Sequence, residues 1–75
     1  MKIYTANYYE WDNSTFLGVF STSKGAIKAL NKFYNENKGI KDDYVVTELT
    51  MDNGTENEFS ATLEEIERYG NKFEN

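Results

Sequence analysis

Residues 21–37 read STSKGAIKALNKFYNEN, and this stretch decides the fold. Its apolar side chains recur at positions i, i+1, i+4, i+7 and i+8: Ala26, Ile27, Leu30, Phe33 and Tyr34. This spacing predicts an amphipathic helix of about four turns. The hydroxyls at residues 21–23 are N-cap candidates, and Gly39 can take the left-handed conformation that ends a helix.

Two runs of strand-forming residues precede this helix. Residues 2–10 are rich in tyrosine and residues 15–20 are mostly apolar, with a polar stretch at residues 12–14 between them. This arrangement predicts a β-hairpin. Gly18 lies inside the second run, where it leaves room for a cross-strand aromatic ring or for a bulge.

The chain after the helix repeats both kinds of pattern. Residues 44–51 predict a third strand that closes on a tight turn at residues 52–54, and residues 55–59 carry a weaker, more polar pattern for a fourth. Thr62 and Glu65 have the spacing of a capping box. The apolar residues that follow share one face of a short helix stopped by Gly70: Leu63, Ile66, Tyr69 and Phe73.

These elements predict one α+β domain over residues 1–75. We expect an antiparallel sheet of three to four strands with one long helix packed on it, in the order β-β-α-β-(β)-α. A chain of 75 residues buries only about 60% of its unfolded surface. Self-association would therefore add useful stability.

The amino-acid composition excludes the commonest catalytic arrangements. The chain has no histidine and no cysteine, so neither a Ser-His-Asp nor a Cys-His arrangement can be built. Residues 52–58 resemble the start of a calcium loop, but Leu63 stands where the bidentate acid is needed, and a hairpin turn explains the same residues. We expect no enzyme activity, no cofactor and no metal site.

Charge is divided along the chain. The net charge is −5; residues 1–41 carry six lysines and three acids (+3), and residues 42–75 carry ten acids and two bases (−8). Carboxylates on a small rigid domain can imitate the phosphates of a duplex. The acidic candidates for partner binding are Asp42, Asp43, Glu48, Asp52, Glu56, Glu58, Glu64, Glu65 and Glu67. The alternative is that they serve solubility alone.

Aromatic residues crowd the first hairpin. Strand alternation gives Tyr9 and Trp11 one parity and Tyr4 and Tyr8 the other, so one pair faces away from the helix. Tyr8, Tyr9 and Trp11 are therefore candidate partner-binding residues, because tyrosine and tryptophan anchor protein interfaces. Packing in the core is the alternative for the same rings.

The remaining features concern nucleic acid and membranes. Lys24, Lys28 and Lys32 recur at i+4 steps, which suits phosphate contacts beside stacking tyrosines, but net acidity favours a merely solvated helix face. We expect no direct binding of nucleic acid. No apolar run reaches membrane-spanning length and the N-terminus lacks a secretory pattern, so we expect a soluble cytoplasmic protein of a bacterial host.

The opening hairpin resembles a known family. Residues 3–7 (IYTAN) followed by residues 17–20 (LGVF) look like the N-terminal hairpin of ArdA-type anti-restriction proteins, acidic DNA mimics of mobile elements. The resemblance covers about the first twenty residues. Residues 17–22 are also similar to small uncharacterised proteins of low-GC Firmicutes and their phages. Both resemblances imply a mobile-element protein that works by binding.

We therefore expect a non-catalytic binding protein from a phage or mobile element. It would inhibit a host nucleic-acid enzyme, as anti-restriction or anti-CRISPR proteins do, by covering it with an acidic surface. The alternative is a small structural or regulatory module without a nucleic-acid role. Such a module would form a homodimer through its sheet edge or aromatic face.

Overall fold

The computed structural model describes residues 1–52 and 55–73, with side chains other than those of residues 52, 55 and 56. Its elements follow one another as β1 (Lys2–Glu10), β2 (Asn13–Phe20), α1 (Ser23–Asn37), a short 3-10 turn η1 (Lys41–Asp43), β3 (Tyr44–Asp52), β4 (Thr55–Thr62) and α2 (Leu63–Tyr69). The predicted α+β class and element order are confirmed. The helix predicted to be long, α1, has an ordinary length of 15 residues.

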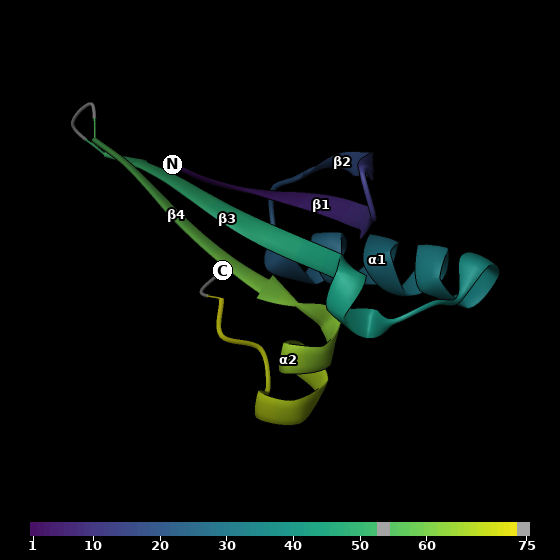
Figure 1. Cartoon of the computed structure of the whole chain (residues 1–75). Helices are drawn as coiled ribbons and strands as arrows, with labels where there is room; N and C mark the ends of the chain where they lie inside the picture. The colour runs from purple at the N-terminus through teal and green to yellow at the C-terminus, as the bar shows by residue number, and fades with distance from the viewer. Residues whose placement is uncertain (53–54, 74–75) are drawn as a thin grey trace.

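The sheet is antiparallel throughout, in the order β2-β1-β3-β4. Figure 1 shows α1 and α2 on the same side of it. The fourth strand forms despite its polar residues and runs to Thr62, beyond the predicted end at residue 59. Because β4 is an edge strand paired with β3, its polar side chains can remain in water. The tight turn predicted at residues 52–54 falls on residues 53–54, which lie outside the described residues.

The first hairpin closes more tightly than predicted. Glu10 pairs directly with Asn13, so the connection is Trp11 and Asp12 alone, not residues 12–14. Trp11 has a φ of 50°, the positive value that two-residue hairpin turns require. Strand register therefore overrides the local turn preference of the Asp-Asn-Ser sequence.

A bulge interrupts β2 at Gly18. Ala6 pairs with Gly18 and Asn7 with Phe16, which leaves Leu17 as the extra residue. Gly18 has a φ of 145°, and a Cβ atom there would lie 3.2 Å from the Phe20 ring. The predicted bulge is confirmed, but the prediction of a cross-strand ring is wrong, because the ring beside Gly18 is that of Phe20 on the same strand.

The helix ends are capped as predicted, with one difference. The Thr22 hydroxyl accepts a hydrogen bond from the Gly25 amide at 3.1 Å, and Thr62 and Glu65 form the full capping box of α2. Gly70 ends α2 with a φ of 87°. At the end of α1, Lys38 itself takes a positive φ, ahead of Gly39.

Aromatic rings fill the space between the sheet and the helices. Tyr44 is fully buried; its ring lies 4.5 Å from that of Tyr8 and 5.4 Å from that of Tyr34, and its hydroxyl donates to the Lys38 carbonyl. Leu30 from α1 and Val46 from β3 belong to the same buried cluster. The core thus joins β1, β3 and α1.

The second helix does not bury all of the residues that were predicted to share one of its faces. Leu63 is buried, but Tyr69 is exposed. Phe73 lies beyond the end of α2 and packs edge-on against Tyr4 and Phe59. The segment after Gly70 therefore turns back to the sheet, as Figure 1 shows, instead of continuing the helix.

Replacing Gly18 by alanine tests the bulge. We expect Gly18→Ala to lower the free energy of unfolding by about 1–3 kcal/mol, because the side chain combines a positive φ with the contact to Phe20. Urea denaturation measures this. Gly25→Ala is the matched control, since an added Cβ there meets only ordinary contacts, and it should leave stability unchanged or slightly raised. Equal stability of Gly18→Ala and wild type would contradict this account.

Tyr44 should make the fold sensitive to alkaline pH. Burial raises the pKa of Tyr44 above its ordinary value of 10.0, so folding favours the neutral phenol. This stabilisation is complete below pH 10 and is lost as pH rises from 10 through the folded-state pKa. Thermal unfolding followed against pH should show the loss, and Tyr44→Phe should reduce it. An identical alkaline profile for Tyr44→Phe and wild type would refute this assignment, and Tyr9→Phe provides the control at an exposed tyrosine.

Candidate interaction surface

The side of the sheet turned away from α1 and α2 is here called the open face. Strand register and alternation place these described residues on it: Ile3, Thr5, Asn7, Tyr9, Ser14, Phe16, Val19, Val45, Thr47, Leu49, Met51, Glu58, Ser60 and, at the end of β4, Thr62. None of the described helices or loops packs over them, and Figure 1 shows the sheet bare on that side. The open face is therefore available to a partner.

Large apolar side chains are exposed on the open face. Phe16 is 61% exposed, Val19 57%, Met51 56% and Tyr9 45%. Ile3, Val45 and Leu49 lie between them and are half-buried by their neighbours. Contiguous exposed apolar surface of this kind marks interaction sites in monomeric proteins.

Charge is sparse among the described side chains of the open face. Charged residues make up 28% of the chain, yet of the fourteen described residues of this face only Glu58 is charged. Glu58 lies on the edge strand β4, at the margin of the face. Depletion of charge at the centre is the compositional mark of protein interfaces.

Two hydroxyl groups of the open face pair with each other. Thr47 and Ser60 lie opposite one another on β3 and β4, and their hydroxyls form a hydrogen bond of 2.9 Å. Burying a hydroxyl without a partner is costly. This pair can therefore lose its water when a partner covers it.

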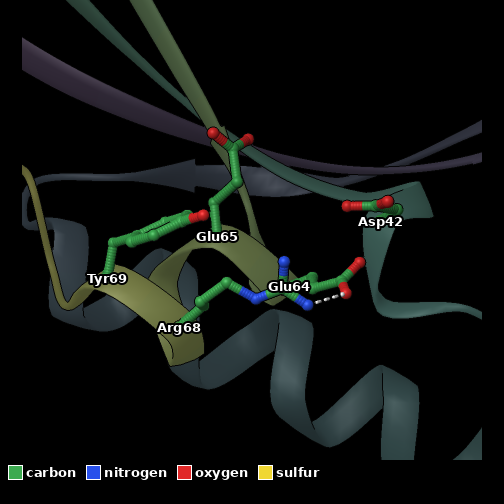
Figure 2. A pocket seen from close by; sticks show the side chains of 5 residues that line it. All are labelled: Asp42, Glu64, Glu65, Arg68 and Tyr69. Atoms are coloured by element: carbon green, nitrogen blue, oxygen red, sulfur yellow. Dashed lines mark hydrogen bonds and ion pairs between the residues drawn. The ribbon is translucent and has the colours of Figure 1, made fainter.

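A second surface lies where η1 meets α2, and we call it the acidic end. It contains a hollow of about 260 Å³. Figure 2 shows the side chains that line it: Asp42, Glu64, Glu65, Arg68 and Tyr69. Sequence reasoning expected Asp42, Glu64, Glu65 and Glu67 to bind a partner, and the structure brings these four close together. The described acids do not form a group of three or more that could hold a metal ion.

Local interactions occupy the carboxylates of the acidic end. Arg68 pairs with Glu64 at 3.1 Å, and Lys41 pairs with Glu67 at 2.5 Å. The hydrogen bond to Glu67 raises the pKa of Lys41. Glu65 completes the capping box, and Asp42 accepts a hydrogen bond from the Thr62 hydroxyl. Four acids and two bases leave this end with a charge of about −2, which weakens its field.

The other predicted acids lie elsewhere. Glu48 lies on the helix side of the sheet, where it accepts a hydrogen bond of 2.9 Å from the Tyr4 hydroxyl, and Glu58 lies on the open face. Asp43 is half-buried at the end of η1. The side chains of Asp52 and Glu56 are outside the described part of the chain. The acids that can be placed therefore do not form one continuous surface.

The predicted aromatic residues separate by strand parity. Tyr9 and Trp11 are exposed, and Trp11 is fully so, at the tip of the first hairpin. Tyr8 lies instead on the helix side, packed against Phe33. Its hydroxyl donates to Glu10 at 3.0 Å, and this hydrogen bond raises the pKa of Tyr8. Tyr8 is thus a core residue and not an exposed anchor.

Sequence reasoning missed the apolar residues of the open face, chiefly Phe16, Val19, Leu49 and Met51. Phe16 and Val19 have opposite parity in the sequence, so strict alternation assigns them to opposite faces. The bulge at Gly18 shifts the register and brings both to the same face. Leu49 and Met51 do alternate with Glu48 and Thr50, and that pattern was the available signal.

Comparisons with known proteins do not assign a function to either surface. Comparison with protein-family models, curated proteins and solved structures gives no significant match to this chain. The resemblance of the first twenty residues to ArdA-type proteins stays a prediction. No helix within the described residues has the length and apolar character needed to cross a membrane.

Proposed function

We propose that this chain is a non-catalytic binding domain that acts on another protein molecule through its open face. The supporting observation is the combination of exposed Phe16, Val19 and Met51 with a single charged residue among the described side chains of that face. Covering apolar surface contributes about 25 cal/mol per Å². A surface this poor in charge favours a protein partner over the phosphates of nucleic acid.

The carboxylates of the acidic end favour a binding function over a catalytic one. In the hollow at the acidic end, Glu64 and Glu65 are engaged in an ion pair and a helix cap. A general acid or base needs a pKa near the working pH and a free path to its substrate. These carboxylates instead hold α2 in place, so their first role is structural.

Site-specific photo-crosslinking tests the open face as a binding surface. A photoreactive amino acid is placed at Val19 or, as the control, at Lys28 on the exposed surface of α1. In cells that express the chain, irradiation should yield covalent protein adducts from position 19 and few or none from position 28. Adducts measured by mass spectrometry identify the partner. Equal labelling from both positions, or none from position 19, would refute the proposal.

The acidic end carries a second candidate function. We propose, as the sequence reasoning did, inhibition of a host nucleic-acid enzyme by acidic occlusion, now confined to this end. The observation that favours it is the gathering of Asp42, Glu64 and Glu65 around one hollow, with Glu67 beside it in an ion pair with Lys41. The ion pairs there cost little to rearrange, because exposed salt bridges stabilise by only about 0–1 kcal/mol.

Charge reversal separates this candidate from the first. Glu64→Lys/Glu67→Lys should abolish inhibition of a sensitive restriction or CRISPR nuclease, and inhibition by wild type should weaken steeply as salt rises. Glu65 is left intact because it caps α2. The control Asn31→Lys/Asn35→Lys adds two positive charges on exposed α1 positions. Inhibition that survives both charge reversal and high salt would rule out acidic occlusion.

A further inference from the structure

We infer that the occupant of the open face is a second copy of this chain, packed sheet on sheet as a symmetric dimer. This inference rests on the proposed function, because it names the protein that the open face binds.

The open face is large enough for a stable dimer. Adjacent strands lie about 4.8 Å apart and rise about 3.3 Å per residue, so four strands of about eight residues cover roughly 500 Å². The accessible area is larger, since exposed side chains such as Phe16 and Met51 stand out from the sheet. Two copies would bury about 1,000 Å² or more, which meets the approximate minimum area of a biological interface.

The scarcity of charged side chains on the open face favours a second copy of the chain over other protein partners. The open face offers a charged partner almost nothing to pair with, so its occupant must itself present an apolar surface poor in charge. The chain has one, and of the charged side chains that the structure describes, all but Glu58 lie elsewhere on the molecule. Two copies therefore repel each other least when they meet through this face. Glu58, on the edge strand β4, would remain at the rim in contact with water.

The relief of the open face suits face-to-face packing. Val19 is exposed on β2, and its neighbour across the strand pair is the smaller Thr5 on β1. Phe16 on β2 likewise lies opposite Asn7, and the exposed Tyr9 on β1 lies opposite the smaller Ser14. Prominent side chains therefore border lower positions on both strands. Sheets with the same twist pack about 10 Å apart with interdigitating side chains, at about 30° to each other. A two-fold axis lets each copy supply both the ridge and the groove.

The hydrogen bonding of the open face and the small size of the chain also favour a dimer. Thr47 and Ser60 already share a hydrogen bond, so closure leaves this pair satisfied. The core on the helix side is small, because Tyr44, Leu30 and Val46 are among only a few fully buried large residues in the described part. A domain of this size gains much of its stability from added burial. A second sheet would supply that burial without any new element of the chain.

Sedimentation velocity on the purified full chain tests the dimer. We expect a species of twice the 8.7 kDa monomer at micromolar concentration. Phe16→Lys/Val19→Lys should weaken the association by more than about 100-fold, since two interface anchors are lost and two charges would be buried. The control Asn31→Lys/Asn35→Lys adds the same charge on α1 and should remain dimeric. Circular dichroism checks that each variant is folded.

A second measurement distinguishes association from misfolding. The thermal midpoint of wild type should rise with protein concentration, and that of Phe16→Lys/Val19→Lys should not. A wild-type chain that stays monomeric, with a midpoint independent of concentration, overturns the dimer. If Val19 then crosslinks a different protein, the proposed function stands without it. If position 19 crosslinks nothing, both fall.

Discussion

The ring of Tyr44 lies where most of the structure meets. It begins β3, packs against Tyr8 of β1 and Tyr34 of α1, and donates a hydrogen bond to the carbonyl of Lys38 at the end of that helix. Because the hydroxyl is satisfied there, the whole ring can be buried without an unpaired polar atom. One side chain thereby sets the distance between helix and sheet and the point where α1 must end.

This arrangement places the available helices on a single side. Helix α1 packs on the inner surface of β1 and β3, against Tyr4, Ala6, Tyr44 and Val46. Leu63 and Phe73 bury the same side of the sheet beside β4. Nothing in the described chain is left for the other surface of the sheet. The exposed Phe16 and Val19 are thus a direct consequence of where the core formed.

Local sequence signals predicted the helices and strands well, whereas the hairpin connection and the fourth strand depend on pairing between strands. The spacing of Ala26, Leu30 and Tyr34, with the cap at Thr22, was sufficient for α1 because each signal is local. The connection at Trp11 and Asp12 depends on cross-strand register, and β4 depends on pairing with β3. The candidate site was harder still, because which strand surface the helices cover is a property of the whole fold.

Gly18 also limits how far copies of this chain can assemble. Edge strands with free backbone groups invite endless strand addition, and β2 is an edge without a charged residue or a proline. The kink at Gly18 breaks its straight ladder, and the acids in β4 guard the opposite edge. Growth by sheet extension is thus discouraged at both margins. In the proposed dimer, contact through the open face closes on itself after two copies, and the bulge at Gly18 discourages further growth at the β2 edge.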